Sequence, residues 1–306
     1  MSERLAVKDE RFLEILEVEA DLEVVASGFE FTEGPVWNPQ RGELIFSDIV
    51  GNCMYRWTPE GGVSEFRRPS QMANGSTLDR QGRLLTCEHA TSRVTRLETD
   101  GSLSVLAANY DGLELNSPND IVVRSDGLVC FSDPNFGRRP RVGVPRPQQQ
   151  PVQGVYCFDP GTHELRRVAG DFGNPNGLCF SLDESRLFVN DSPRGHIRVF
   201  SVHSDGALEG GGVWAEVLGS GKGVPDGMKI DCQERLYCCG PGGIHVFDQA
   251  GRELGVIWVP EQTANFTWGG PDLRTLYITA STTLYRLAVK VPGLPWQPAN
   301  SGGDQG

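Results

Sequence analysis

The sequence is poor in positive charge. Its 306 residues include 28 lysines and arginines against 40 aspartates and glutamates, which gives a formal net charge of −12 at pH 7. Proteins that bind nucleic acids neutralise phosphates with basic patches, so we expect no nucleic-acid partner. The sequence also has no apolar run close to the ~20 residues that a membrane-spanning helix needs. Its first residues, MSERLAVKDERF, contain no apolar signal core, so we expect a cytoplasmic protein that does not enter a membrane.

Several motifs of common catalytic and metal sites are also missing. The five histidines form no H-x-H or H-E-x-x-H spacing, and the eight cysteines form no C-x-x-C pair. These absences argue against a structural zinc site and a zinc-protease site. The absence of a G-x-S-x-G motif argues against serine hydrolase chemistry. Most of the cysteines lie in apolar, strand-like runs, so we expect buried free thiols and a reducing compartment.

Glycine and proline are abundant, with 38 and 20 residues, and short apolar runs lie between them. This composition is typical of all-β proteins, in which turns separate many short strands. Six segments repeat one pattern: a polar residue, a short apolar stretch, a turn and a second strand. The segments are 33–48, 74–89, 119–133, 176–191, 226–240 and 265–279. A leucine that marks the second strand recurs every 40 to 59 residues, at Leu44, Leu84, Leu128, Leu187, Leu236 and Leu276.

Repeats of this length predict the four-stranded blades of a β-propeller, and six copies predict six blades. The sixth repeat has no fourth strand of its own. A strand over 22–27, before the first repeat, is expected to complete it and to close the ring without open edges. We therefore expect one six-bladed propeller domain over 1–306. It should carry a helical extension over 1–21, with an amphipathic helix at 9–20, and a flexible tail over 291–306.

Each repeat opens with a polar residue. These six residues are Glu33, Asn74, Asn119, Asn176, Asp226 and Asn265. Because first strands line the channel of a propeller, the pseudo-rotation should bring the six side chains to one height around the axis. Buried oxygens that face one another need a cation or water, and an all-oxygen set suits Ca²⁺, Mg²⁺ or Mn²⁺. As an alternative, the Asn-Gly and Asp-Gly pairs form turns at strand starts, a role that glutamate does not share.

Four of the repeats carry motifs that resemble a known family. The motifs are FTEGPVW (31–37), NSPNDIVV (116–123), NPNGLCFSLD (174–183) and VPDGMKID (224–231). They closely resemble the senescence marker protein, gluconolactonase and luciferin-regenerating enzyme family, and the resemblance covers residues 22–290. The NSPND form is similar to the bacterial gluconolactonase branch, because Ser117 stands where the animal branch has a sugar-contacting arginine. The resemblance implies a six-bladed propeller that holds a divalent metal and opens sugar lactones.

The resemblance also implies roles for individual residues. The expected metal ligands are Glu33, Asn119, Asn176 and Asp226. Asn74 and Asn265 are then expected to bind substrate beside the metal, with the Asn74 amide donating to the oxyanion. The expected cofactor is one divalent ion, Ca²⁺ first and Mg²⁺, Mn²⁺ or Zn²⁺ as alternatives, which would polarise the carbonyl and activate water. Asp226 or Asp120 is the expected catalytic base; for Asp120, an ion pair or a turn cap is the alternative.

The ends of the second strands should surround the same mouth of the channel. They include Asp48, Glu88, His89, Asp133, Asn135 and Asp191. Of these, His89 and Asn135 are expected to bind substrate, although a plain rim position is an equal alternative for His89. Residues 138–153 interrupt the third repeat with a segment rich in proline, arginine and glutamine, which forms either a lid or a passive loop.

These observations support three hypotheses for function. The first is a divalent-metal-dependent, gluconolactonase-like lactonase that acts on a small-molecule lactone as a monomer or weak homo-oligomer. The second is a phosphotriesterase-like or other ester hydrolase, because the same metal can polarise a phosphoryl oxygen. The third is a non-enzymatic metal-binding propeller, because a fold does not fix a function.

Overall fold

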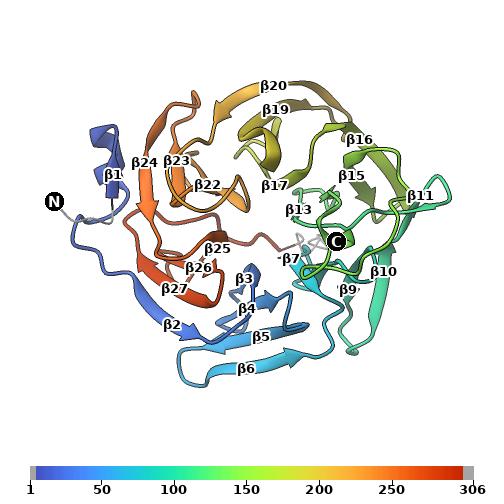
Figure 1. Ribbon diagram of the computed structural model, residues 1–306, viewed down its shortest axis with the longest axis horizontal. Coiled ribbons are helices and arrows are strands. Elements are labelled where there is room, and N and C mark those ends of the chain that lie inside the picture. The colour runs from blue at the N-terminus through green and yellow to red at the C-terminus, as the bar shows by residue number, and fades with distance from the viewer. Residues whose placement is uncertain (1–4, 299–306) are drawn as a thin grey trace, which may run out of the picture.

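Residues 5–298 of the chain are described by a computed structural model, in which six antiparallel sheets form a ring (Figure 1). Five of the sheets have four strands and one has five. In each sheet the first strand of the repeat lies next to the channel and the later strands follow outward. The expected six-bladed β-propeller is therefore confirmed.

The strands of the six blades follow the sequence repeats. Blade one contains β3 (Thr32–Asn38), β4 (Glu43–Asp48), β5 (Cys53–Thr58) and β6 (Gly62–Arg67). Blade two contains β7 (Ala73–Leu78), β8 (Leu84–Glu88), β9 (Arg93–Leu97) and β10 (Leu103–Ala107). Blade three contains β13 (Ile121–Val123), β14 (Val129–Asp133), β15 (Gln153–Asp159) and β16 (Glu164–Phe172). Blade four contains β17 (Pro175–Phe180), β18 (Arg186–Asp191), β19 (His196–Val202) and β20 (Leu208–Glu216).

The last two blades use strands from both ends of the chain. Blade five contains β21 (Met228–Ile230), β22 (Leu236–Gly240), β23 (Gly243–Phe247), β24 (Glu253–Trp258) and β1 (Leu5–Val7). Blade six contains β25 (Thr263–Gly269), β26 (Thr275–Ala280), β27 (Thr283–Ala288) and β2 (Glu23–Ser27). A short hairpin, β11 (Asn109–Tyr110) and β12 (Leu113–Glu114), leads into blade three. Two 3₁₀ helices, η2 (Phe136–Arg138) and η3 (Ser192–Arg194), follow second strands.

The ring closes as the sequence predicts. Strand β2 pairs antiparallel with β27, so that Glu23 lies opposite Arg286 and Ser27 lies opposite Thr283. Strand β2, which precedes blade one in the sequence, thus supplies the outer strand of blade six. The closed ring has no open sheet edge between its first and last blades.

The N-terminal extension differs from the expected helix over 9–20. It contains only a single-turn 3₁₀ helix, η1 (Glu10–Glu14), preceded by β1, which adds a fifth strand to blade five. Phe12, Ile15 and Leu16 are buried in one hydrophobic cluster with the outer strands of that blade. Because Phe12 lies in this short helix and Ile15 and Leu16 are the two residues after it, a longer helix is not needed to bury the three side chains.

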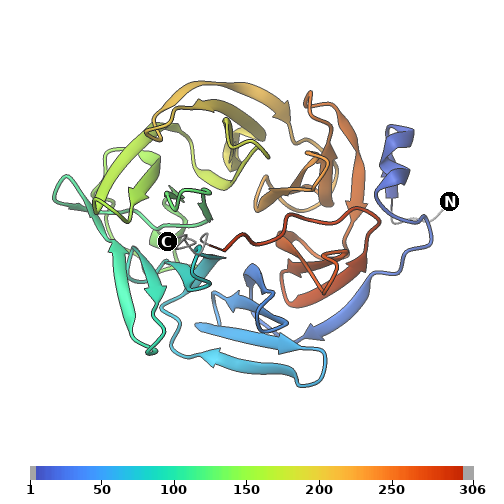
Figure 2. The same cartoon turned by 180° about the vertical axis from the view of Figure 1, so that it is seen from behind.

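Residues 291–298, the described part of the expected flexible tail, make contacts across the ring. Val291 is buried, Gly293 pairs with Asp231, and the Trp296 indole Nε1–H donates to the Asp79 carbonyl over 2.9 Å. Figure 2 shows this end of the chain crossing from blade six toward the middle of the ring. The rest of the expected tail, 299–306, lies outside the described residues.

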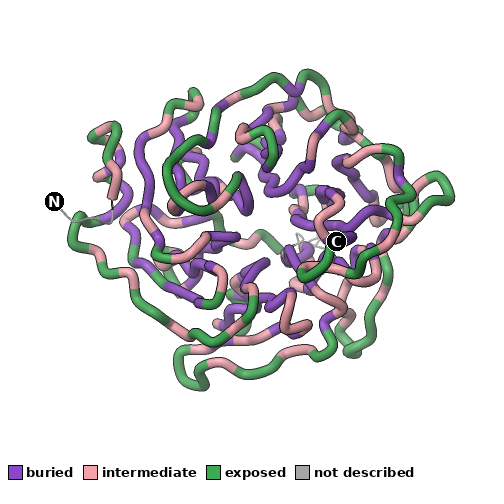
Figure 3. Tube along the Cα trace, viewed as in Figure 1, coloured by how far each residue is buried: buried purple, intermediate pink, exposed green. Residues whose placement is uncertain are grey.

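The apolar core lies between neighbouring blades. The inner and middle strands are mostly buried, whereas the outer strands alternate or face solvent (Figure 3). Within residues 5–298, no helix has the length and apolar character that a membrane crossing requires.

The expectation that all cysteines are free is wrong for one pair. Cys130 and Cys157 form a disulfide, because the register of β14 and β15 places them directly opposite each other with Cα atoms 4.1 Å apart. The other six are free, five of them buried and Cys232 exposed. The disulfide removes part of the basis for expecting a reducing cytoplasm.

Candidate metal centre

The six polar residues that open the repeats lie at the channel end of each blade. Asn74 and Asn176 lie inside the first strands of their blades, as do Glu33 and Asn265, whereas Asn119 and Asp226 come just before β13 and β21. All six side chains are buried. In four blades the strand register shifts at or beside the opening residue, and such bulges turn a side chain out of the regular alternation.

Glycines bring neighbouring opening residues close together. A Cβ atom on Gly34, which has φ of +51°, would lie 1.9 Å from the Asn74 carbonyl oxygen in the next blade. A Cβ on Gly75 would lie 2.4 Å from the Asn119 carbonyl, to which the Gly75 N–H donates over 2.8 Å. Gly177 and Gly227 make the corresponding approaches to Asp226 and Asn265. Only glycine fits here, so the Asn-Gly and Asp-Gly pairs serve contacts between blades rather than isolated turns.

Aspartates at the ends of second strands hold the chain just before three opening residues. The Asp48 carboxylate accepts the N–H groups of residues 30 and 31, and Asp133 accepts those of residues 116 and 117. Asp191 accepts those of residues 173 and 174. These aspartates were expected around the mouth of the channel, and their carboxylates bind backbone N–H groups there.

Three carboxylates influence one another inside the channel. Burial, together with the negative charge of Asp120, raises the pKa of Glu33 to about 7. Burial and then the charges of Glu33 and Asp120 raise the pKa of Asp226 well above its usual range. Burial also raises the pKa of Asp120. Burial of these neighbouring carboxylates thus favours their protonated forms unless a positive charge lies close to them.

Amides link these carboxylates. The Asn176 Nδ2–H donates to the Ser192 hydroxyl over 3.1 Å, and a hydrogen bond from the Asn176 side chain also lowers the pKa of Asp226. A hydrogen bond from the Asn265 side chain lowers the pKa of both Glu33 and Asp120. Four of the six opening residues therefore lie within reach of one another or of Asp120. Asn119 is joined to the set through its backbone, by the bond from Gly75.

Lys229 also contributes to this site, and the sequence analysis missed it. Its Nζ lies 3.4 Å from the Asn265 Oδ1, and its positive charge lowers the pKa of both Glu33 and Asp120. A signal was available: three residues after each opening residue the chain has Val36, Thr77, Val122, Cys179, Lys229 and Trp268. Lys229 is the one charged residue in that set.

His89 lies behind Asn74 rather than in the open channel. It is 1% exposed, its Nδ1 lies 2.8 Å from the Val142 carbonyl, and its Nε2 lies 3.1 Å from the Asn74 Nδ2. Burial lowers the pKa of His89 to about 4, so the ring is neutral near pH 7. Because a carbonyl only accepts, Nδ1 carries the proton and Nε2 accepts from the Asn74 amide. The Asn74 Oδ1 is then left as a buried acceptor with no partner among residues 5–298.

Asn135 points into the segment 138–153. Its Oδ1 accepts from Arg139 over 2.7 Å, and its Nδ2 donates to Gln148 over 3.5 Å. The structure therefore does not bring Asn135 into contact with the carboxylates described above.

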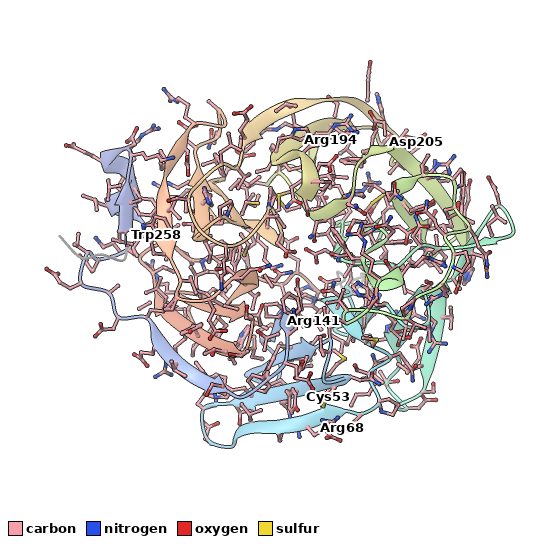
Figure 4. The ribbon with its side chains drawn as sticks, in the orientation of Figure 1. Cys53, Arg68, Arg141, Arg194, Asp205 and Trp258 are labelled. Carbon is pink, nitrogen blue, oxygen red and sulfur yellow. A yellow bond between two sulfur atoms is a disulfide. The ribbon has the colours of Figure 1, made fainter. Side chains whose placement is uncertain are left out.

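The segment 138–153 is anchored to the rim of the channel. Buried Arg138 donates to the Asn116 carbonyl over 2.8 Å and pairs with Glu114 over 2.8 Å. Val142 from this segment meets His89, and exposed Arg141 lies near the middle of the ring in projection (Figure 4). These contacts place the segment 138–153 on the side of the channel where His89 accepts a hydrogen bond from Asn74.

The donors fit a hard divalent cation. Two carboxylates and two amides offer oxygen ligands, and the neighbouring Asp120 Oδ2 is buried without a hydrogen-bond partner within residues 5–298. Over the same residues, no three His, Cys, Asp or Glu side chains form a group that could hold a metal. The expected ligand set contains only two carboxylates, and the metal site stays a prediction.

Comparisons with known proteins show which family this chain resembles. The family model described as SMP-30/Gluconolactonase/LRE-like region matches residues 31–282. Gluconolactonase of Zymomonas mobilis is 33% identical over 301 residues, covering 91% of this chain and 84% of its own. Pentonolactonase XacC of Haloferax volcanii is 29% identical, with 84% of both chains covered. A solved gluconolactonase structure from Xanthomonas campestris has a TM-score of 0.87 at 33% identity, over 94% of this chain and 95% of that one.

Proposed function

This chain belongs to the SMP-30/gluconolactonase/LRE-like family, and from that membership we propose that it is a metal-dependent lactonase acting on a sugar lactone. Relatives that are 33% and 29% identical are named gluconolactonase and pentonolactonase. The observation that carries the proposal is the group of three buried carboxylates, Glu33, Asp120 and Asp226, beside amide groups in the channel. Burial raises the pKa of all three, the charge of Asp120 raises that of Glu33, and the charges of Glu33 and Asp120 raise that of Asp226. A bound cation would stabilise the charged forms of these carboxylates, and a charged carboxylate can take a proton from water.

The metal would be held by the oxygen donors of four opening residues. These are Glu33, Asn119, Asn176 and Asp226. Oxygen ligands of this kind favour Ca²⁺, with Mg²⁺, Mn²⁺ and Zn²⁺ as alternatives. When bound, a divalent ion supplies Lewis-acid polarisation of the lactone carbonyl.

The remaining residues have separate tasks. Asp120 accepts the Ile121 N–H through Oδ1 over 2.9 Å, while its Oδ2 has no partner within the described chain. This free oxygen makes Asp120 the preferred base to take a proton from water, with Asp226 as the other candidate. The Asn74 Nδ2 is engaged by His89 and its Oδ1 has no partner within the described chain, so we assign Asn74 to accept a substrate hydroxyl hydrogen rather than to donate to an oxyanion. Asn265 holds the two carboxylates that it contacts in place.

A panel assay with metal control tests the proposal. Lactone opening is followed by acid release with aldonolactones and pentonolactones, and organophosphates and simple esters are run in parallel. We expect turnover of a sugar lactone that a chelator abolishes and Ca²⁺ restores. Glu33→Gln and Asp226→Asn should lose that activity with folding retained, whereas Glu30→Gln, at an exposed position three residues earlier, should keep it.

The other outcomes of this assay either contradict the proposal or favour one of its alternatives. Full activity of Glu33→Gln and Asp226→Asn after removal of metal would contradict the proposal. Turnover confined to organophosphates or esters would favour the phosphotriesterase-like alternative. No turnover on any substrate, with retained Ca²⁺ binding, would favour a non-enzymatic metal-binding propeller.

A further inference from the structure

The channel continues beyond the candidate metal centre into a second cavity. This cavity has a volume of about 890 Å³, and inner strands of all six blades line it. The first residue of each repeat faces the metal centre, and the residue three positions later lines the cavity. The cavity therefore lies further along the same strands, toward the mouth opposite the segment 138–153.

The cavity wall combines apolar, polar and charged residues. Its aromatic residues are Trp37, Phe180, Trp268 and Trp296, and its aliphatic residues include Val36, Ile121, Val123, Ile230 and Leu294. A volume of several hundred cubic ångströms with aromatic and aliphatic walls and some polar groups is typical of sites for small organic ligands. The charged lining residues are Arg80, Arg124, Asp183, Glu184 and Lys229. All but Lys229 are held by neighbours in the rim: Arg80 donates to the Ser125 carbonyl, Arg124 pairs with Asp126, Asp183 accepts from Ser185, and Glu184 accepts from Ser125.

Lys229 supplies the cavity with a positive charge. It is partly exposed, and its Nζ contacts the Asn265 Oδ1 at 3.4 Å and lies 5.9 Å from the centre of the Phe266 ring. Within residues 5–298 it has no carboxylate oxygen within 4.0 Å. An ammonium group donates three hydrogen bonds, and a partly exposed one beside an apolar wall can still receive an anion.

The C-terminal segment forms part of the cavity wall. Leu294, Pro295, Trp296 and Gln297 line the cavity. Trp296 is fixed by its bond to the Asp79 carbonyl, and the Gly293 N–H donates to the Leu273 carbonyl over 3.0 Å. Figure 2 shows the segment crossing toward the centre on the face nearer the viewer. The opposite mouth is thus narrowed by an ordered indole rather than left as a wide opening.

We propose that this cavity is a second ligand site, which binds an amphipathic organic monoanion with a flat apolar body and one carboxylate or sulfonate group. The acidic group meets Lys229, and the apolar body lies among Trp37, Trp268 and Trp296. Lys229 is the one charged residue at the equivalent positions of the six blades, so it is the group that meets the acidic end of the ligand. The site does not depend on the lactonase reaction.

A matched pair of fluorescent probes tests the proposal. 8-Anilinonaphthalene-1-sulfonate has the required charge and rings, and N-phenyl-1-naphthylamine has the same rings without the sulfonate. We expect the sulfonate to bind the folded full-length protein about tenfold tighter or more than the neutral probe. Lys229→Met should remove this difference, and Lys222→Met, at an exposed position outside the cavity, should retain it.

A second variant separates cavity binding from an electrostatic effect of Lys229 on the metal centre. Thr77 lines the cavity and is only partly buried, so Thr77→Trp should fill the space and weaken both probes at least tenfold with the fold unchanged by circular dichroism. The proposal is overturned if Lys229→Met binds the sulfonate as wild type does, or if Thr77→Trp leaves both affinities unchanged. Because the readout is probe fluorescence, loss of lactonase activity would neither support nor contradict it.

Discussion

The imidazole of His89 and the amide of Asn74 form a pair in which the histidine accepts and the asparagine donates, over 3.1 Å. The Val142 carbonyl fixes the histidine tautomer from the other side, over 2.8 Å. The orientation of the Asn74 amide in the channel is therefore set by the segment 138–153 through a buried histidine. His89 thus orients Asn74, the residue that we propose to bind substrate.

Removing this pair should weaken substrate binding more than turnover. His89→Leu frees the Asn74 amide to rotate, so we expect KM for the lactone to rise about tenfold with kcat changed less than threefold, the cost of one hydrogen bond. His89→Gln places an acceptor near the former Nε2 and should recover part of the loss. Steady-state kinetics of the three proteins measure this.

The control for this series is His163→Gln, which changes an exposed histidine in the turn between β15 and β16. It should have wild-type kinetics. A fall in kcat of tenfold or more in His89→Gln with KM unchanged would instead make His89 a participant in the chemical step.

The same histidine predicts a pH dependence of stability. Burial, together with the positive charge of Arg146, lowers the pKa of His89 from 6.5 to about 4, against the opposing effect of the Val142 carbonyl. The unfolded chain then binds more protons than the folded chain between these values, so stability falls as pH falls from 6.5 toward 4. At one pKa unit per 1.36 kcal/mol, we expect about 2 to 3 kcal/mol to be lost by pH 4.5 through this group.

Denaturant unfolding of wild type and His89→Leu at pH 4.5, 5.5 and 7 measures this contribution. The difference in stability between the two proteins should narrow as the pH falls. A difference that stays constant over the range would show that His89 titrates alike in the folded and unfolded chains.

Replacing Glu33 should stabilise the metal-free protein and remove its stabilisation by Ca²⁺. In metal-free protein its charge is buried beside Asp120 and Asp226, so Glu33→Gln should raise the free energy of unfolding by about 1 to 3 kcal/mol in the presence of a chelator. Added Ca²⁺ should raise the melting temperature of wild type and not that of the variant. Thermal unfolding with and without Ca²⁺ checks both parts, and a variant that Ca²⁺ stabilises as strongly as wild type would remove Glu33 from the metal set.

Repetition made much of the fold predictable. Six copies of one strand pattern fixed the number of blades, and the missing fourth strand of the last repeat indicated that β2 closes the ring. The opening residues were found for the same reason, because pseudo-symmetry carries one sequence position to one place in space.

Features that do not recur among the six repeats were not predicted. Strand β1 has three residues and pairs with a blade more than 240 residues away, so no local pattern indicates it. The Cys130–Cys157 pair depends on a register set across the insertion 138–153. Lys229 is the one charged residue three positions after an opening residue, but the importance of that position becomes clear only when those residues are seen to line a cavity. Three aspartates bind backbone N–H groups: Asp48, Asp133 and Asp191. Their role depends on which N–H groups lie near them in the fold, and the residue type alone does not show this.

The glycine contacts between blades give the last prediction. A methyl group at residue 75 would lie 2.4 Å from the Asn119 carbonyl, so Gly75→Ala must push blades two and three apart at the level of the metal centre. We expect a loss of about 1 to 3 kcal/mol in unfolding free energy and a weaker affinity for Ca²⁺, because Asn119 moves relative to its neighbours. Gly212→Ala is the matched control, since a Cβ there meets nothing within 4 Å. Chemical unfolding and Ca²⁺ titration of both variants provide the comparison. Equal Ca²⁺ affinity in Gly75→Ala and Gly212→Ala would show that this contact stabilises the ring without positioning the ligands.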